Sequence, residues 1–551
     1  MERNVASKET LPLLRSHLSP LTSHLSLLTS HLSPLTLTIP VLTPEQSNSW
    51  DHHAAAAGLD LATLMENAGR ASVVVLANRY GHLLRTGVLV AAGPGNNGGD
   101  GWVIARALHR ADVPVWVAGS GEGSRLREQM AQLARAEGVR EVSPDGPWPS
   151  VGLVVDALLG TGATGSPRPA VAGLLSRIHD LATPVVAIDG PTGVDLLTGI
   201  VHGTTRADLT ITFGGFRRGH LLARDEIGDV AVVDIGHPQA DPAWPIIVTD
   251  QLAAGWIRQL RARDHKGDRG RVVVVGGDAG MSGALRLASR AAFAAGAGLV
   301  HAVAPRDTIA ALLPAEPDLQ TMAHSFDEKP SDSLRDLIAR ADAVVVGPGL
   351  GRGPGRRSFV TALVAAARSA VVDADALVAF GGAAEELASL ADDRRLVLTP
   401  HPGEFRTLFP TLAAARELDP WGAASMAADE MGATILLKGV PTVVAGSGRQ
   451  LLTVVAGNPG LATGGSGDVL SGLVATQLTT TLSPEIAAAL AAQILGRAAD
   501  IAARRHTARS MRPMDVVSAL PDLWREWEVI SSGSVAPRPP VIFELPRPHT
   551  T

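Results

Sequence analysis

Short, uniformly apolar runs alternate with longer helical stretches along most of the chain. In the first half the runs read TGVLVAAG, VPVWVAG, VGLVVDALLG and PVVAIDGPTG, and stretches such as SRLREQMAQLARAEG and PAVAGLLSRIHDLA lie between them. Apolar runs of this length are typical of strands buried on both faces, which occur in parallel sheets. The alternation therefore predicts an α/β fold in which helices cover both faces of a mostly parallel sheet.

The alternation breaks near residues 237–250, where HPQADPAWPIIVTD contains three prolines. A second series of apolar runs follows, reading GRVVVVGG, ADAVVVGPGLG, SAVVDADAL, RLVLTPHPGE and ATILLKG. The chain has 551 residues, and single cores stop growing at about 250–300 residues. We therefore expect two α/β domains, over residues 41–240 and 241–528, with a linker near residues 237–260.

Both ends of the chain depart from this pattern. Residues 16–36 read SHLSPLT, SHLSLLT and SHLSPLT, and they lack the basic and continuous apolar segments of a signal peptide. The tail after residue 528 is rich in proline and serine. We expect a low-complexity disordered extension over residues 1–40 and a disordered tail over residues 529–551.

The composition excludes several classes of function. A formal net charge of −6, 3% aromatic residues and a single tyrosine argue against nucleic-acid binding, which requires a basic face and stacking rings. The chain has no cysteine, which excludes disulfides, thiolate metal sites and cysteine nucleophiles. No uninterrupted apolar run reaches the length of about 18 residues that a membrane span needs. We expect a cytoplasmic protein with no membrane and no nucleic-acid partner.

Three glycine-rich polar clusters follow apolar runs of the first domain. They are GPGNNGGDG at 93–101, DALLGTGATG at 156–165 and DGPTGVD at 189–195. Strand ends of an open parallel sheet gather ligands, and glycines let backbone N–H groups approach a phosphate. The first cluster lacks the Lys-Ser/Thr ending of a Walker loop and the usual G-x-G-x-x-G spacing. One cluster alone is equally consistent with a tight turn, but three at one sheet edge favour a binding site.

Oxygen atoms in these clusters suit a hard cation. Asn97, Asp156 and Thr192 offer carbonyl, carboxylate and hydroxyl oxygens. A monovalent ion fits better than Mg²⁺ because only one of the three is a carboxylate. Turn and cap residues are the alternative interpretation.

Two sets of motifs carry a family resemblance. LMENAG at 64–69, GPGNNGGDG, VDALLGTG at 155–162 and AIDGPTGVD at 187–195 together resemble the NAD(P)H-hydrate epimerases. GPGLG at 347–351, PHPGE at 400–404, LKG at 437–439 and GGSGDVLSG at 464–472 resemble the ADP-dependent NAD(P)H-hydrate dehydratases. The resemblance covers roughly residues 41–525. It implies a Rossmann-like domain followed by a ribokinase-like domain, in a bifunctional enzyme that repairs hydrated nicotinamide cofactors.

The resemblance also implies the roles of residues in the first domain. Asp189 matches a substrate-binding carboxylate and the acid/base group, and the family's potassium ligands match Asn97, Asp156 and Thr192. The family usually has an aliphatic residue at Gly190, where glycine is expected to leave a small gap, and serine at Thr192, which keeps the hydroxyl oxygen. FRRG at 216–219 replaces a usual lysine, so the contact made there stays open. The other hydrate-binding positions are Asn96, Asn97, Gly98, Gly99, Asp100, Gly160, Thr161, Gly162, Ala163, Thr164, Gly165 and Ser166.

In the second domain the resemblance implies transfer of phosphate from ADP, with Mg²⁺, to the hydroxyl of the hydrate. Asp468 is the expected base, and the dipole of its helix is expected to lower its pKa. A lone histidine such as His401 is more often structural, and a strand-end lysine such as Lys438 more often extends its charged group into solvent. The motifs around these two residues favour binding instead. The matching hydrate contacts are Ala284, Gly349, His401 and Asp468, and the nucleotide contacts are Lys438, Gly439, Val440, Pro441, Thr442 and Gly467.

Two alternative functions remain at this stage. GSGD also resembles the anion hole of kinases for vitamin precursors such as hydroxymethylpyrimidine or a thiazole alcohol, here fused to a nucleotide-binding domain. A nucleotide sensor or scaffold would require lost acid/base residues, yet Asp189 and Asp468 are present. The resemblance leaves open whether NADHX or NADPHX is preferred and whether ADP or ATP is the donor. We expect a homo-oligomer.

Overall fold

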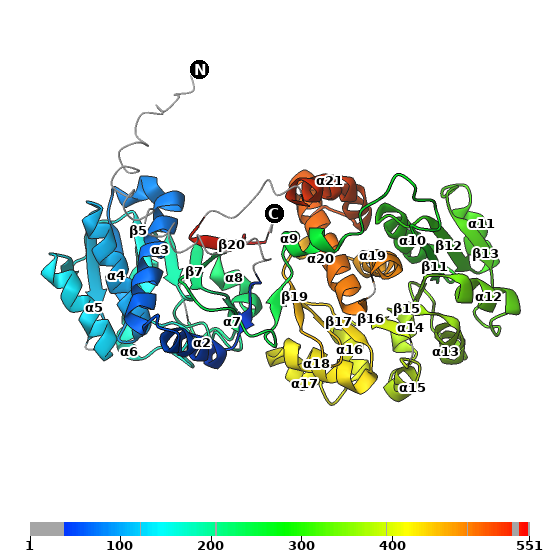
Figure 1. Cartoon of the computed structure of the whole chain (residues 1–551), viewed down its shortest axis with the longest axis horizontal. Coiled ribbons are helices and arrows are strands. Elements are labelled where there is room, and N and C mark those ends of the chain that lie inside the picture. Colours follow the sequence, from blue (N-terminus) through cyan, green and yellow to red (C-terminus); the bar gives the residue numbers. More distant parts are fainter. Residues whose placement is uncertain are drawn as a thin grey trace, which may run out of the picture. The chain divides into compact units, whose positions relative to one another are not determined.

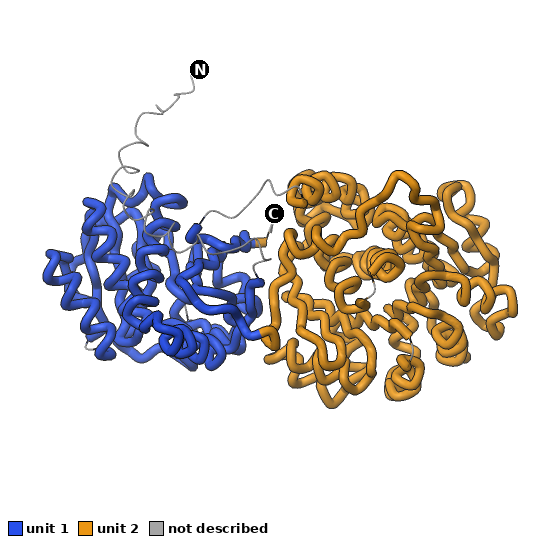
Figure 2. Tube along the Cα trace, in the orientation of Figure 1, with its two compact units in different colours: residues 1–241, 536–547 blue, residues 242–535, 548–551 orange. Residues whose placement is uncertain are grey.

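The chain forms two compact units. The computed structural model describes residues 38–121, 123–203, 206–392, 394–481, 483–531 and 539–548. Unit 1 comprises residues 1–241 and 536–547, and unit 2 comprises residues 242–535 and 548–551 (Figure 2). The predicted N-terminal extension lies outside the described residues, except for residues 38–40, of which Ile39 is buried.

Unit 1 is built on an eight-stranded sheet of order β20-β9-β7-β6-β5-β2-β3-β4. Every strand pair is parallel except the one between β20 and β9. A short pair, β1 with β8, lies outside it. The strands are β1 (Val41–Leu42), β2 (Val88–Ala92), β3 (Val115–Gly119), β4 (Arg140–Val142), β5 (Leu153–Ala157), β6 (Val185–Ile188), β7 (Leu209–Phe213), β8 (Phe216–Arg217), β9 (Asp229–Val233) and β20 (Val541–Leu545).

Helices cover both faces of this sheet (Figure 1). Alternate residues of β2 belong to different core clusters: Val88 and Val90 pack with α3, α4 and α5, whereas Leu89 and Ala91 pack with α6. This separation explains why the strand sequences are apolar throughout, and it confirms the predicted α/β class. The helices are α2 (Pro44–Ala56), α3 (Leu61–Leu84), α4 (Asn96–Arg110), α5 (Arg125–Ala136), α6 (Pro169–Asp180), α7 (Arg218–Leu222) and α8 (Arg224–Ile227).

The expected disorder of residues 529–551 is wrong for part of this tail. Residues up to Ser531 belong to the last helix of unit 2, and β20 forms an edge strand of unit 1. In Figure 1 this strand is red and lies among the cyan and green elements of unit 1. The ring of Phe543 also lies 5.8 Å from that of Phe216. The run VIFEL can pair because the edge of β9 supplies a ladder that the surrounding prolines do not interrupt.

Unit 2 is built on a ten-stranded sheet of order β10-β19-β18-β17-β16-β15-β14-β11-β12-β13. Strand β18 runs antiparallel to both of its neighbours, and the other pairs are parallel. The strands are β10 (Ile246–Ile247), β11 (Arg271–Val275), β12 (Leu299–Ala304), β13 (Gln320–Ala323), β14 (Ala343–Val346), β15 (Ser369–Val372), β16 (Arg395–Leu398), β17 (Thr434–Leu437), β18 (Thr442–Ala445) and β19 (Leu452–Val454).

The segment expected as a linker is partly structured, because β10 and α9 both belong to unit 2.

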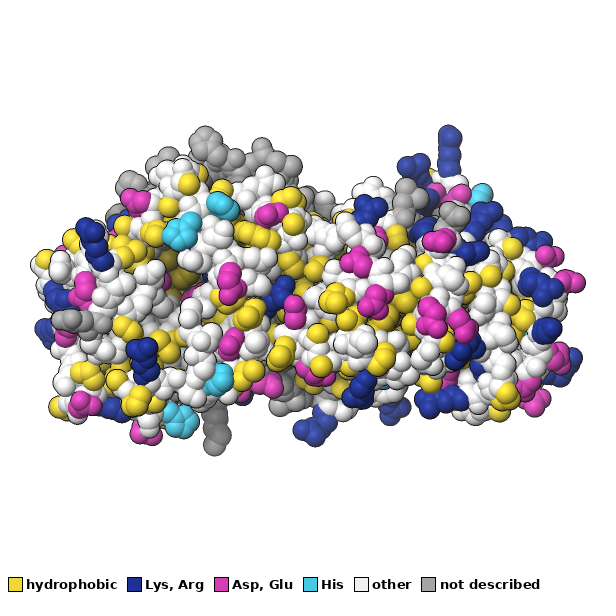
Figure 3. Space-filling view, turned by 90° about the horizontal axis from the view of Figure 1, so that it is seen from below, with side chains coloured by type: hydrophobic (Ala, Val, Ile, Leu, Met, Phe, Trp, Pro, Cys, Tyr) yellow, Lys and Arg dark blue, Asp and Glu magenta, His cyan; other side chains and the backbone are white. Residues whose placement is uncertain are grey.

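Figure 3 shows acidic and basic side chains interspersed on the visible face of each unit. The helices of unit 2 are α9 (Asp250–Trp256), α10 (Ser282–Ala294), α11 (Arg306–Leu312), α12 (Asp332–Arg340), α13 (Arg356–Ala366), α14 (Asp375–Val378), α15 (Ala384–Ala388), α16 (Pro402–Leu408), α17 (Ala413–Leu418), α18 (Pro420–Met431), α19 (Ser466–Thr480), α20 (Pro484–His506) and α21 (Pro513–Ser531).

Among the described helices, α20 alone is long and apolar enough to meet the criteria for a membrane span. Within unit 2, however, 83% of its most apolar window is buried. It packs there against α19 and α21 in the main core.

Each sheet has one point where the strand order reverses. In unit 1 the chain runs from β2 outward through β3 and β4, and then returns to β5 on the other side of β2. The order β4-β3-β2-β5-β6-β7 is that of the dinucleotide-binding fold, with β2 as its first strand. In unit 2 the reversal lies between β11 and β14. Ligands of such sheets bind in the crevice beyond the carboxyl ends of the strands at the reversal.

Candidate active sites

The loops after β2 and β5 meet at the strand reversal of unit 1. A side chain at Gly93 would place its Cβ 1.7 Å from the carbonyl oxygen of Leu158, and one at Gly98 would lie 2.0 Å from the carbonyl oxygen of Gly93. These glycines are therefore required for close backbone packing. Helix α4 begins at Asn96 after a Gly95 cap that offers no side-chain hydrogen bond. Its first N–H groups thus lack a side-chain cap, which suits an anionic group of a ligand.

Asp189 directly follows β6, and hydrogen bonds from Thr161 and Arg217 hold its carboxylate. Its φ of 64° is in the left-handed region, which costs a non-glycine residue about 1–3 kcal/mol. Its carboxylate accepts hydrogen bonds from the backbone N and Oγ1 of Thr161 and from Nη2 of Arg217, at 3.2 Å for the latter. Burial raises the pKa of Asp189, but Arg217 and Thr161 outweigh it and lower the pKa below its usual value. The carboxylate is therefore ionised at neutral pH.

Arg217 and His220 both contact Asp189. Nη1 of Arg217 also donates to the carbonyl oxygens of Phe213 and Gly215, at 3.3 and 2.9 Å. Nδ1 of His220 accepts from the backbone N of Arg217 at 3.0 Å, and Nε2 lies 2.6 Å from the carbonyl oxygen of Asp189. Burial lowers the pKa of His220 to about 4, so the ring is neutral and Nε2 is the donor. The sequence left open which residue of FRRG replaces the usual lysine. Arg217 makes that basic contact, with Asp189.

Gly190 leaves no gap in this region, contrary to expectation. A Cβ at this position would lie 2.8 Å from both methyl carbons of the buried Leu196. The leucine therefore occupies the space that an aliphatic side chain would fill.

Of the three predicted cation ligands, Asp156 and Thr192 bond to each other, and Asn97 lies near the carboxylate of Asp189. Oγ1 of Thr192 donates to Oδ1 of Asp156 at 2.7 Å, and the backbone N of Thr192 donates to Oδ2 at 2.9 Å. Both polar atoms of the Asn97 side chain are buried without a partner among the described residues. A Cβ at Gly160 would lie 3.1 Å from Cγ of Asn97 and 3.0 Å from Oδ2 of Asp189. Asn97 therefore borders the same space as the acid/base candidate.

The donor set fits a monovalent cation. Burial raises the pKa of Asp156, and only hydrogen bonds from Thr192 and Leu158 oppose the shift. A cation would supply the missing positive charge and a partner for the oxygen of Asn97. No group of three or more His, Cys, Asp or Glu side chains in the described part of the chain is placed to hold a metal ion.

Three further parts of the predicted first site are Asp100, Asn96 and residues 162–166. Asp100 lies near the reacting region, because burial and the charges of Asp189 and Asp51 raise its pKa well above the usual value. Asn96 accepts a hydrogen bond from Oγ of Ser124, in the loop after β3, at 3.2 Å. Residues 162–166 form a largely exposed loop at the rim of the crevice.

In unit 2 the loops after β11 and β14 meet in the same manner. A Cβ at Gly276 would lie 2.0 Å from the carbonyl oxygen of Pro348. Gly349 has a φ of 60°, and its carbonyl oxygen accepts from the backbone N of Asp278 at 2.6 Å. A Cβ at Gly349 would also lie 3.2 Å from that of Ala284. The structure therefore brings two predicted hydrate contacts, Gly349 and Ala284, together.

The first turn of α19 faces a charged cluster. Nζ of Lys438 donates to Oδ1 of Asp373 at 2.9 Å and lies 3.6 Å from Oε2 of Glu404. Oγ of Ser471 donates to Oδ2 of Asp373 at 2.6 Å. A Cβ at Gly467 would lie 3.5 Å from Nζ of Lys438. Lys438 is thus held in an ion pair and does not snorkel.

The expected lowering of the Asp468 pKa is wrong. Burial and the charge of Asp373 raise the pKa of Asp468 to about 7, although Lys438 opposes the shift. The helix terminus predicts a lowered pKa only for an exposed carboxylate, and here desolvation is the larger effect. A group with this pKa exchanges a proton readily at neutral pH.

His401 caps α16. Its Nδ1 accepts from the backbone N of Gly403 and Glu404, at 2.9 and 3.3 Å, and Nε2 lies 3.3 Å from Oε1 of Glu404. The side chain keeps 55% of its surface exposed, so one face of the ring stays accessible. In the turn after β17, Oγ1 of Thr442 donates to the carbonyl oxygen of Gly439, and Val440 is exposed.

Sequence reasoning assigned no role to His220, Asp373 and Glu404, which complete these sites, and it left the contact made by Arg217 within FRRG open. Asp373 directly follows β15, and Glu404 lies in the quoted motif PHPGE. The rule that polar residues at strand ends gather ligands could have found Asp373. No local pattern marks His220, because its role depends on the backbone of Asp189.

Both halves of the chain match known families. Residues 61–219 match the model described as YjeF-related protein N-terminus, and residues 272–522 match that of NAD(P)H-hydrate dehydratase. The chain belongs to the family of bifunctional NAD(P)H-hydrate repair enzymes. The small-alcohol kinase is not favoured, because the relatives span both units.

Among the relatives, the bifunctional NAD(P)H-hydrate repair enzyme of Escherichia coli (strain K12) is 37% identical over 84% of this chain and 89% of its own. That of Moorella thermoacetica is 37% identical over 84% of this chain and 92% of its own. Of solved structures, an ADP/ATP-dependent NAD(P)H-hydrate dehydratase from Bacillus subtilis, co-crystallised with ATP/Mg²⁺, is 24% identical with a TM-score of 0.44. That likeness covers 51% of this chain and 97% of the other.

Proposed function

We propose that Asp189 and Asp468 are the acid/base residues of two separate reactions. Unit 1 interconverts the R and S hydrates of NADH and NADPH, and unit 2 dehydrates the S form at the expense of ADP, giving AMP and phosphate. One observation supports this division most strongly. Each unit carries an acid/base candidate, and the pKa values of the two are shifted in opposite directions, lowered at Asp189 and raised to about 7 at Asp468.

In unit 1 the reaction changes the configuration at ring carbon 6, which requires proton movement or opening of a carbon–oxygen bond. Asp189 is ionised and rigidly placed, so it can accept a proton from the bound hydrate and return it. Arg217 and Thr161 keep the carboxylate oriented, and His220 fixes its backbone. Asn96–Asp100 and Gly160–Ser166 would bind the rest of the nucleotide.

We assign Asn97, Asp156 and Thr192 to a potassium ion. The unpartnered amide of Asn97 and the uncompensated charge of Asp156 support this assignment. A bound cation there would attract the phosphates of the hydrate and neutralise the buried carboxylate.

Replacing Asp156 by Ala or by the isosteric Asn should weaken hydrate binding and remove any potassium dependence of epimerisation. The measurement compares KM in potassium chloride and in tetramethylammonium chloride, with thermal unfolding as a check on the fold. Asp180→Ala is the matched control, because Asp180 is exposed at the end of α6. Equal KM values for wild type and variants in both salts would rule out the ion site.

In unit 2, Asp468 would accept the proton of the hydrate's hydroxyl as phosphate is transferred from ADP, and loss of that phosphate then yields NAD(P)H. Lys438 lies beside Gly467 at the start of α19, where a lysine and backbone N–H groups would bind the phosphates. The charges of Asp373 and Asp375 act on Asp468, so the cluster fits Mg²⁺ arriving with the nucleotide. Gly349, Ala284 and His401 would contact the hydrate.

The raised pKa of Asp468 predicts the pH dependence of dehydration. A base must be unprotonated, so kcat/KM should fall about tenfold per pH unit below about 7 and level off above it. Epimerisation should stay flat over the same range, because the pKa of Asp189 is lowered. Profiles of both activities between about pH 5 and pH 8 check this expectation. Parallel profiles for the two activities would contradict it.

Action in the cytoplasm is part of this proposal, and a chain without cysteine needs no oxidising compartment for disulfide formation. Light scattering of the purified chain would test the expected homo-oligomer.

A further inference from the structure

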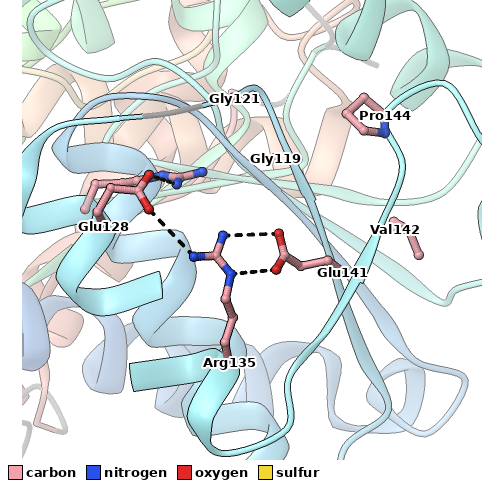
Figure 4. A pocket seen from close by; sticks show the side chains of 8 residues that line it. Gly119, Gly121, Glu128, Arg135, Glu141, Val142 and Pro144 are labelled. Carbon is pink, nitrogen blue, oxygen red and sulfur yellow. Dashed lines mark hydrogen bonds and ion pairs between the residues drawn. The ribbon is translucent and has the colours of Figure 1, made fainter. Parts of the chain in front are cut away.

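A polar cavity lies beyond the carboxyl ends of β3 and β4 in unit 1. It is open to solvent and has a volume of about 440 Å³, within the usual range for small-molecule sites. Figure 4 shows the guanidinium group of Arg135 in it, between the carboxylates of Glu128 and Glu141. The cavity is lined by Gly119, Gly121, Arg127, Glu128, Arg135, Glu141, Val142 and Pro144.

Residues of the cavity and of the segment beside it contact the loop after β2. Nε of Arg127, which is 2% exposed, donates to the carbonyl oxygen of Gly93 at 3.2 Å. The backbone N of Ser124 donates to the carbonyl oxygen of Pro94 at 2.8 Å, and its Oγ donates to Asn96. The cavity therefore lies beside the loop that is proposed to bind the phosphates.

The strand order sets the direction of a bound dinucleotide. In this fold the pyrophosphate lies over the first strand, here β2, and the adenosine ribose lies at the end of the next strand, here β3. The residues assigned to the reaction follow β5 and β6, on the other side of β2. From β6 to β3 there are three strand spacings, about 14 Å. That span suits the two ends of one dinucleotide.

The chemistry of the cavity differs from that of an NAD-binding ribose site. Such a site has an acidic residue free to accept hydrogen bonds from the ribose hydroxyls. Here Glu141 is held by Nε and Nη2 of Arg135, at 2.6 and 3.3 Å. Glu128 accepts from Arg127 and from the backbone N of Gly123. Both carboxylates are therefore already engaged.

The guanidinium of Arg135 is placed to bind an anion. Its Nη1 lies 3.6 Å from Glu128, beyond hydrogen-bond distance, and its Cζ lies 5.0 Å from the ring centre of Trp102. A guanidinium has five N–H donors in a rigid fork. Glu141 takes one from Nε and one from Nη2, which leaves the N–H groups on the edge between Nη1 and Nη2 for a phosphate. The two ion-paired glutamates and the ring hold this fork in place.

We propose that this cavity receives the adenosine ribose of the hydrated dinucleotide and that Arg135 binds its 2′-phosphate, so that unit 1 favours the NADPH hydrate over the NADH hydrate. The proposal rests on the epimerase function of unit 1. It adds the position of the non-reacting end of the substrate and a residue that distinguishes the two cofactors.

Arg135→Gln tests this assignment. KM for epimerisation of the NADPH hydrate should rise about 5- to 20-fold, the loss of one charge-assisted hydrogen bond at a partly exposed site, with kcat unchanged. KM for the NADH hydrate should stay within about twofold. Arg110→Gln is the matched control, because Arg110 is also half-exposed and paired with a glutamate, Glu137, away from the cavity. Separating R and S hydrates by chromatography without ADP measures unit 1 alone.

Competition by small nucleotides tests the 2′-phosphate site separately from the epimerase function. Adenosine 2′,5′-bisphosphate should compete with the NADPH hydrate in the wild type, more strongly than 5′-AMP, and lose that advantage in Arg135→Gln. Glu141→Gln should lower KM for the NADPH hydrate, because it removes a charge that repels the phosphate. Equal effects of Arg135→Gln on both hydrates, or no advantage of the bisphosphate over 5′-AMP, would overturn the proposal while epimerisation persists. Absence of epimerisation in the wild type would instead overturn the function of unit 1.

Discussion

Asp468→Asn should nearly abolish ADP-dependent recovery of NAD(P)H. Loss of a general base costs about 10²–10⁴ in rate. Asn is nearly isosteric and resembles the protonated carboxyl, which is already well populated at neutral pH because the pKa of Asp468 is about 7. The substitution should therefore leave folding intact. The measurement follows absorbance of the reduced cofactor with the S hydrate and ADP.

Ser447→Ala is a suitable control, because Ser447 is an exposed residue of unit 2 whose hydroxyl donates to Asp429 at 2.8 Å. Epimerisation by Asp468→Asn should continue at the wild-type rate, since distant sites act independently. Full dehydration by the folded Asp468→Asn variant would show that another group is the base.

Asp189→Asn should slow conversion of the R hydrate to the S hydrate by about 10²–10⁴. Asparagine tolerates the left-handed conformation required by the φ of 64° better than most residues. Its amide oxygen can still accept from Thr161, as Oδ2 of Asp189 does. Its NH₂ group would then face Nη2 of Arg217 and cannot accept from it, so the basic charge and the ion pair with Arg217 are both lost. Chromatographic separation of the two hydrates measures this rate directly.

Two comparisons control this result. Dehydration of the S hydrate by Asp189→Asn should equal that of the wild type. The Tm is expected to fall, because the buried Arg217 loses the carboxylate that offsets its charge and keeps only its hydrogen bonds to two backbone carbonyls, so folding of the variant is checked by thermal unfolding. Loss of dehydration in a folded Asp189→Asn variant would show that the two reactions share a site.

The strands and the glycine loops could be predicted because both are local patterns. The run TGVLVAAG became β2, and the cluster after it became the loop and first turn of α4. Buried strands require apolar side chains on both faces, and close loop contacts such as that of Gly93 exclude a Cβ. These constraints are visible without any knowledge of distant residues.

The ionic contacts within each site could not be predicted in the same way. Arg217 reaches Asp189 only because β7 and β6 are neighbours, and Lys438 reaches Asp373 across β15, β16 and β17. The raised pKa of Asp468 has the same origin, since burial and Asp373 are properties of the folded unit. Pairing of β20 with β9 likewise depends on a partner far along the chain.

Complementation between variants tests the central claim, two independent active sites in one chain, most directly. Purified R hydrate and ADP are supplied to folded Asp189→Asn, to folded Asp468→Asn, and to an equimolar mixture of the two, and absorbance of the reduced cofactor is followed. We predict that neither variant alone recovers NAD(P)H at an appreciable rate and that the mixture does, because each supplies the site that the other lacks. A mixture as inactive as the single variants would contradict the assignment of the two reactions to Asp189 and Asp468.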